Sequence, residues 1–158
     1  MPQTLPDLLR AGTLDAELAA TLWLLVGGRV PVIIASPEPG PAVAGLMVAL
    51  LDFLPAGVRT VELTGEDESF DWLPQASELG WERRPGSSRP RRGGPLVRPG
   101  STVLVAPDLA GDPAASTAHG QVARLAIRAA TIGYGLAATV RATSLEGVLA
   151  VLAEPPVG

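Results

Sequence analysis

The sequence contains no cysteine, no lysine and no asparagine, and its one histidine is His119. Without cysteine there can be no disulfide, iron–sulfur cluster or thiolate zinc site, and one histidine cannot build a histidine-based metal site. Without lysine, Schiff-base chemistry and a lysine on a phosphate group are excluded as well. We therefore expect neither a metal nor a cofactor, and we expect His119 to be a surface or half-buried side chain.

Charge is also scarce, and long apolar runs are missing. Charged residues make up 18% of the chain, against roughly 25% in typical soluble domains. The stretch Leu14–Val26 is interrupted by Asp15 and Glu17, and Ala42–Leu54 by Asp52, so neither has the length of a membrane span. The first ten residues have no basic head and no signal-type apolar core. We place the protein in the cytoplasm and expect part of its surface to be apolar.

The 158 residues suit one domain, 1–158, with a proper core. Short runs of β-branched or alternating apolar residues predict four strands, at Val32–Ala35, Val58–Leu63, Thr102–Ala106 and Tyr134–Val140. Helical patterns lie around and between them, at Pro6–Ala11, Leu14–Val26, Pro41–Leu54, Pro113 to about Ala130, and Leu145–Ala153. This alternation predicts an α/β fold, a three-layer αβα sandwich with a mainly parallel sheet.

Several helix starts are predicted from capping residues. Thr13 is a good N-cap for the second helix, and Asp112 with Pro113 would begin the fourth. Thr143 and Glu146 have the spacing of a capping box before the last helix. Between the second and third strands, the apolar residues of 72–81 predict a short helix or hairpin.

The most informative stretch is Val30–Leu54, which predicts a buried strand, a tight turn and an apolar helix. A phosphate-binding loop with the pattern G-x-x-x-x-G-K-[ST] would lie at this turn. The eight corresponding positions are Ala35, Ser36, Pro37, Glu38, Pro39, Gly40, Pro41 and Ala42. The spacing is therefore right, while the residues that bind phosphate are missing.

The loss of phosphate binding follows from the chemistry of these residues. Such a loop presents consecutive backbone N–H groups to the anion, and Pro37, Pro39 and Pro41 have none. Pro41 takes the place of the lysine, Ala42 that of the Mg²⁺-binding hydroxyl, and Glu38 adds a negative charge. Charge-assisted hydrogen bonds contribute roughly 1.5–3 kcal/mol each. Losing several removes more than about 4 kcal/mol, or about a thousandfold in affinity.

The segment 83–100 differs from the rest of the chain in charge. It has no acidic residue and contains six of the twelve arginines: Arg83, Arg84, Arg89, Arg91, Arg92 and Arg98. Its proline, glycine and serine content predicts a flexible basic loop. The rest of the chain has six arginines against sixteen acids, a net charge of about −10. The loop could bind an acidic partner or nucleic acid, or fold back over its own acidic surface, and its lack of aromatic residues disfavours nucleic acid.

Four segments in the same order resemble the RecA-like motor domain of the type II/IV secretion and pilus-assembly ATPases. They are Leu9–Val26, Val30–Leu54, Arg98–Ala106 and Gly133–Ser144, and because they are spread from residue 9 to residue 144 the likeness runs over nearly the whole chain. The resemblance implies a RecA-like fold of the P-loop NTPase superfamily. It also implies that the fourth strand lies between the first and the third, with the second beyond the third. Because the chain stops at Gly158, we expect the family's fifth strand to be absent.

The departures from the family fall on its chemistry. Besides Pro41 and Ala42, the pair Ala106-Pro107 occupies the Walker B Gly-Glu position, so the glutamate that polarises water is missing unless Asp108 replaces it. Arg141 occupies the histidine position of the family's Thr-x-His box. The resemblance therefore implies a degenerate motor domain without Walker A, Walker B or His-box function.

Three functions are compatible with the sequence. The first is a non-catalytic, pseudo-ATPase-like protein that contacts secretion or pilus machinery or its own copies, most simply as a dimer. The second is an ATP-binding enzyme with an unorthodox phosphate site, in which the arginine-rich loop replaces the lysine. The third is a nucleic-acid-binding module that uses the same loop.

Overall fold

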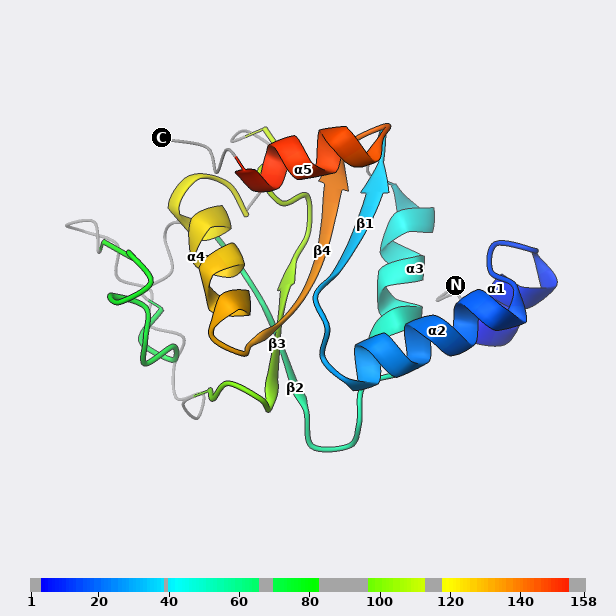
Figure 1. Cartoon of the computed structure of the whole chain (residues 1–158), viewed down its shortest axis with the longest axis horizontal. Coiled ribbons are helices and arrows are strands. Elements are labelled where there is room, and N and C mark those ends of the chain that lie inside the picture. The colour runs from blue at the N-terminus through cyan, green and yellow to red at the C-terminus, as the bar shows by residue number, and fades with distance from the viewer. Residues whose placement is uncertain (1–3, 39, 66–69, 83–96, 113–117, 154–158) are drawn as a thin grey trace.

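The computed structural model describes residues 4–38, 40–65, 70–82, 97–112 and 118–153. Its centre is one four-stranded sheet, in which every neighbouring pair of strands is parallel (Figure 1). The strands are β1 (Val32–Ser36), β2 (Arg59–Glu62), β3 (Thr102–Ala106) and β4 (Gly135–Arg141), in the order β1-β4-β3-β2. The parallel sheet and the expected strand order are thus confirmed.

Helices cover both faces of this sheet. They are α1 (Leu5–Arg10), α2 (Ala16–Gly27), α3 (Pro41–Leu51), α4 (Gly120–Thr131) and α5 (Leu145–Ala153). Alternate residues of β4 pack against different helix layers, because the side chains of a strand alternate between the two faces of the sheet. Leu136 and Ala138 lie in the main core with α4 and α5, whereas Ala137 packs with Met47 of α3. The α/β sandwich predicted from the sequence is therefore present.

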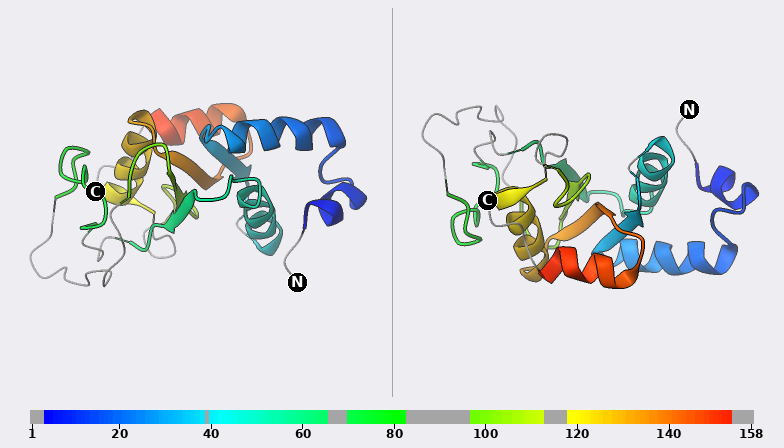
Figure 2. Two further views of the ribbon diagram at one scale, coloured as in Figure 1. Left: turned by 90° about the horizontal axis from the view of Figure 1, so that it is seen from below. Right: turned by 90° about the horizontal axis from the view of Figure 1, so that it is seen from above.

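One face of the sheet has too few helices to cover it. The crossover from β1 to β2 passes through α3 and spans the whole sheet. The connections from β2 to β3 and from β3 to β4 run in the opposite direction across the sheet, so right-handed crossovers place them on the opposite face. A helix is about 10 Å wide, and strands lie about 4.8 Å apart, so α3 covers only about two strands. Figure 2 shows α1 and α2 beside α3, where their core residues pack on that helix. Part of the β2–β3 side of this face therefore stays open.

The main core lies on the other face and includes the segment 70–82. This segment consists of turns, so the predicted helix or hairpin is wrong. Its apolar side chains are nevertheless buried, with the rings of Phe70 and Trp81 4.4 Å apart. The Tyr134 hydroxyl, just before β4, donates a hydrogen bond of 2.8 Å to Gln75 Oε1. Aromatic packing and this bond hold the turns against the sheet.

The second helix begins later than Thr13, the N-cap predicted for it. Asp15 is the N-cap of α2, and its carboxylate accepts a 2.7 Å hydrogen bond from the Leu18 N–H. The N–H groups of Thr13 and Leu14 instead donate to the Leu8 carbonyl. The end of α1 therefore uses the two residues that were expected to begin α2.

The predicted start of the fourth helix at Asp112 and Pro113 is also wrong. The Ala110 N–H donates a 2.8 Å hydrogen bond to the Ala118 carbonyl, which closes a loop before the helix can begin at Gly120. Pro113 lies outside the described residues. The half-buried His119 is the N-cap residue of α4, without a side-chain cap bond.

Two smaller corrections concern α3 and α5. α3 ends at Leu51 rather than Leu54. α5 has the predicted bounds, but the Gly147 N–H donates to Ser144 Oγ at 3.1 Å, so Ser144 takes the capping role expected of Thr143. Hydrogen bonds from its own backbone N–H and from the Ser144 hydroxyl lower the pKa of Glu146.

Candidate functional site

The turn after β1, the residues after β3 and the end of β4 meet at one edge of the sheet. They do so because the carboxyl ends of parallel strands lie together. Ser36 is paired with Arg141, and Ala106 with Ala138. The Ala142 N–H also donates to the Ser36 carbonyl at 3.1 Å. Of the sequence-predicted positions, 35–38, 40–42, 106–108 and 141 are thus brought to the same edge.

The turn that follows β1 is closed by its own side chains. Ser36 Oγ donates a 2.7 Å hydrogen bond to the Glu38 carbonyl, so this hydroxyl is used within the turn. Gly40 is the N-cap of α3 with extended backbone, φ −167°, and Pro41 begins the helix. Pro39 lies outside the described residues. Pro37 and Pro41 have no N–H to donate, which leaves the turn poor in the donors that a phosphate group needs.

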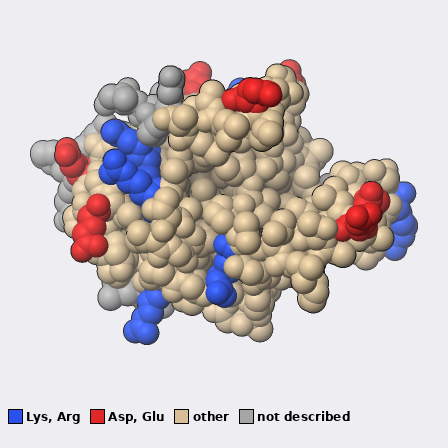
Figure 3. All heavy atoms as spheres, in the orientation of Figure 1, with Lys and Arg blue, Asp and Glu red and all other residues tan. Residues whose placement is uncertain are grey.

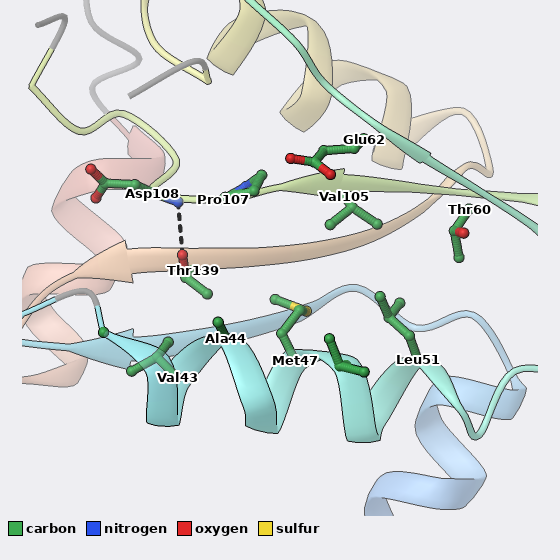
Figure 4. Close-up of a pocket in the computed structure, with 12 residues that line it drawn as sticks. Val43, Ala44, Met47, Leu51, Thr60, Glu62, Val105, Pro107, Asp108 and Thr139 are labelled. Carbon is green, nitrogen blue, oxygen red and sulfur yellow. Dashed lines mark hydrogen bonds between the residues drawn. The ribbon is translucent and has the colours of Figure 1, made fainter. Parts of the chain in front are cut away.

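Asp108 is fixed by β4. Its N–H donates a 2.7 Å hydrogen bond to Thr139 Oγ1, shown as the dashed line in Figure 4. The next N–H, of Leu109, donates to the Thr139 carbonyl at 2.7 Å. Asp108 has a positive φ of 49°, a conformation that aspartate tolerates better than most residues. These contacts turn the chain sharply after β3 and set the direction of the carboxylate.

The Asp108 carboxylate forms a two-point ion pair with Arg141. Arg141 Nε lies 3.0 Å from Oδ1, and its terminal nitrogen Nη2 lies 3.1 Å from Oδ2. The Asp108 side chain is 13% exposed and that of Arg141 45%. Forked pairing of this kind is among the stronger polar contacts of proteins. The turn after β3 is therefore tied to the end of β4 through its carboxylate.

Two further acids lie near this guanidinium. The hydrogen bond to Asp108 raises the pKa of Arg141 above its usual value, and the negative charges of Asp108, Asp112 and Glu38 raise it further. One positive charge thus faces three carboxylates. The local field near the turn after β1 therefore favours a cation over an anion.

A groove of about 680 Å³ opens between α3 and the β2–β3 side of the sheet (Figure 4). One wall is apolar, since it is formed by residues of α3. The other wall is formed by the strands and carries Thr60 and Glu62 of β2 and Val105 of β3. The complete lining is Gly40, Val43, Ala44, Met47, Val48, Leu51, Thr60, Glu62, Val105, Pro107, Asp108 and Thr139. The groove has the size of a ligand pocket, and its walls are better suited to apolar groups than to phosphates.

The arginine-rich loop contributes little to this site in the described part of the chain. Arg83, Arg84, Arg89, Arg91 and Arg92 lie outside the described residues. Arg98 precedes β3 and therefore lies at the opposite edge of the sheet from the turn, with its carbonyl accepting a hydrogen bond from Ser101. A five-residue strand is about 16 Å long, so Arg98 does not reach the turn.

Sequence reasoning missed several residues of the site. Thr139 could have been found, because side chains alternate between the two faces of a strand. Thr139 therefore lies on the same face of β4 as Ala137, the face that α3 covers. Glu62 and Asp112 carried no signal, because their relevance depends on the strand order and on the loop after β3.

Within the described ranges, no group of three or more His, Asp or Glu side chains is placed to hold a metal ion. The helices of the same ranges include none that is both long and apolar enough to cross a bilayer.

The comparisons with known proteins add no relative: no family model matches this chain, and no curated protein or solved structure does.

Proposed function

We propose that this chain is a non-catalytic, pseudo-ATPase-like domain, resembling secretion and pilus-assembly motor domains, that acts through protein–protein contacts in the cytoplasm. The ion pair between Asp108 and Arg141 is the observation that carries the proposal. An acid that is to polarise water or hold Mg²⁺ needs its negative charge and its oxygens available at the end of the sheet where the phosphate would lie. Here both carboxylate oxygens accept from a guanidinium.

The charges around the turn support the same proposal. A nucleoside triphosphate would enter a region where the negative charges of Glu38, Asp108 and Asp112 outnumber the positive charge of Arg141. Each unit of like charge at about 4 Å costs roughly 4 kcal/mol at an effective dielectric constant of 20. The turn has neither the lysine nor the row of N–H groups that would offset this cost.

The groove is a place where the domain can bind apolar groups rather than phosphate. Its α3 wall consists of aliphatic side chains, among them the half-exposed Val48. Apolar grooves of this size take apolar side chains or ring systems. The partners proposed are components of secretion or pilus machinery and other copies of this chain.

A titration with a fluorescent ATP analogue, with and without Mg²⁺, tests the proposal. We expect no saturable signal up to millimolar nucleotide in the wild-type protein. The Arg141→Ala variant serves as the matched sample, because it frees the Asp108 carboxylate without adding a phosphate ligand. Saturable micromolar binding by the wild type that Mg²⁺ strengthens would overturn the proposal and favour an unorthodox ATP site.

A further inference from the structure

The helix α2 has an exposed surface that is almost entirely apolar. Only Ala19 and Val26 of its twelve residues are buried, and eight are exposed. Trp23 is 58% and Leu24 66% exposed, while Glu17 is the single charged residue of the helix. A helix that is apolar on nearly all sides is normally buried. In the described part of the chain, α2 packs through one narrow seam on α3.

The exposed residues of α2 fall into a definite pattern around the helix axis. At 100° per residue, Ala16, Ala20, Trp23 and Leu24 form one stripe beside the buried seam. Glu17 borders this stripe, since it lies only about 20° from Leu24 around the axis. Thr21 follows it, and Leu18 and Leu25 lie on the other side of the seam. Ala20 is at the centre of this stripe, with the small Ala16 on its N-terminal side and the large Trp23 and Leu24 on its C-terminal side. We call this set, Ala16, Ala20, Trp23 and Leu24, the α2 stripe.

We propose that the α2 stripe is where a second copy of this chain docks, as an antiparallel pair of α2 helices around a two-fold axis at Ala20. The proposal deepens the proposed function, since it names the surface through which the chain contacts itself. With a rise of 1.5 Å per residue, Trp23 of one copy falls between the partner's Ala16 and Ala20. Leu24 falls opposite the partner's Ala16. Large side chains thus meet small ones on both sides of the axis.

The antiparallel arrangement is also favoured by charge. It aligns the two helix dipoles in opposite directions and separates the two Glu17 side chains by about 9 Å along the axis. A parallel pair would place Trp23 against Trp23 and Glu17 beside Glu17. Two-fold pairing is the commonest closed arrangement of identical chains.

A membrane surface fits the same helix less well. Helices that lie on membranes carry lysine or arginine on their polar side, and α2 has neither. Figure 3 shows few charged side chains on the face of the molecule that bears α2. The second copy is therefore the occupant that its composition fits.

Light scattering coupled to gel filtration at tens of micromolar protein tests the proposal. We expect twice the chain mass of 16.2 kDa. Trp23→Glu should give the monomer mass, because it places a charge in the contact. Ala20→Trp should do so too, because it keeps the stripe apolar but fills the space at the axis. Leu145→Glu on α5, at a residue that is 70% exposed, is the control and should leave the dimer intact.

Because the chain has no cysteine, one introduced cysteine can serve as a crosslinking probe in a second test. Ala20→Cys should form a disulfide-linked dimer under mild oxidation, because residues on a two-fold axis face each other, whereas Leu145→Cys should not. A wild-type monomer, a dimer unaffected by either α2 variant, or no Ala20→Cys crosslink would overturn the proposal. The nucleotide titration does not depend on whether the chain forms a dimer. A monomeric wild-type protein would therefore contradict the docking proposal alone, and nucleotide binding would contradict the proposed function alone.

Discussion

Arg141 and Asp108 join the end of β4 to the turn after β3 across 33 positions of sequence. β4 fixes the position of both partners of this ion pair. Thr139 of β4 accepts a hydrogen bond from the Asp108 N–H, and Arg141 is the last residue of the same strand. A side chain at Gly111 would collide with the Asp108 carboxylate, so the short loop also requires a glycine there. The ion pair is thus built into the turn.

The first prediction concerns the contribution of this pair to stability. We expect Arg141→Ala to lower the melting temperature more than Arg10→Ala does. Arg10 also pairs with an acid, Asp7 at 2.8 Å, but those side chains are 74% and 51% exposed, and such surface pairs contribute little. Thermal denaturation of the two variants in one buffer checks the order. Equal shifts would mean that the Asp108 pair is no stronger than a surface pair.

The second prediction concerns ATP. We expect millimolar ATP with Mg²⁺ to leave the melting temperature unchanged. A site with Kd a hundredfold below the ligand concentration would stabilise the fold by about 2.7 kcal/mol, which for a chain of this size is several degrees. Differential scanning fluorimetry with and without nucleotide measures this. A shift of that size in the wild type would contradict the pseudo-ATPase proposal.

The third prediction concerns packing between β3 and β4. A Cβ at Gly135 would lie 2.7 Å from Val103 Cγ2 and 3.5 Å from the Val103 Cα. We expect Gly135→Ala to destabilise the protein by about 1–3 kcal/mol, the usual cost of overpacking a core. Urea denaturation measures the change.

Two further variants control this experiment. Gly27→Ala, where no atom lies within 4 Å of the new Cβ, should be neutral or slightly stabilising, because alanine favours helix. Adding Val103→Ala should remove part of the cost of Gly135→Ala by making room. A double variant whose loss of stability equals the sum of the single losses would show that the two residues do not compete for space.

The fourth prediction uses the scarcity of titratable groups. Burial raises the pKa of Tyr134 above its usual 10.0. Above about pH 10 the unfolded chain therefore loses the phenol proton while the folded chain keeps it, so stability falls as pH rises, by at most about 1.4 kcal/mol per pH unit. Below that pH the contribution is fully present. Tyr134 is the single tyrosine, and lysine and cysteine are absent, so no other side chain titrates in this window.

Denaturant midpoints between pH 9 and pH 11 check this dependence. Tyr134→Phe should flatten the curve. It should also cost about 1 kcal/mol at neutral pH, because the hydrogen bond to Gln75 is lost. A wild-type curve as flat as that of the variant would show that the phenol stays as accessible to water in the folded chain as in the unfolded one.

Strands such as Val32–Ser36 and Thr102–Ala106 were predictable because each is a short run with β-branched residues, bounded by proline or glycine. Helix starts were less predictable, since several capping residues lie close together and tertiary contacts select among them. Thr13 has the right side chain, but its N–H is used to end α1. The helix α4 starts late because the bond between Ala110 and Ala118 joins residues that local patterns do not relate.

The candidate site was predictable in part. The spacing of the turn singled out 35–42, and the resemblance singled out Asp108 and Arg141, yet neither indicated that Asp108 and Arg141 form an ion pair. The groove was not predictable, because it results from one helix having to cover four strands. That mismatch is a property of the strand order rather than of any short segment.

The strand order also determines when the sheet can form. Val32 of β1 pairs with Ala137 of β4, so β1 is synthesised roughly a hundred residues before the strand that pairs with it. At about 5–20 residues per second, the apolar strand and the α2 helix before it remain without their sheet for roughly 5–20 s on the ribosome. Pairing over such a sequence separation is slow. The N-terminal third of the chain is therefore the part that most needs protection from aggregation during synthesis.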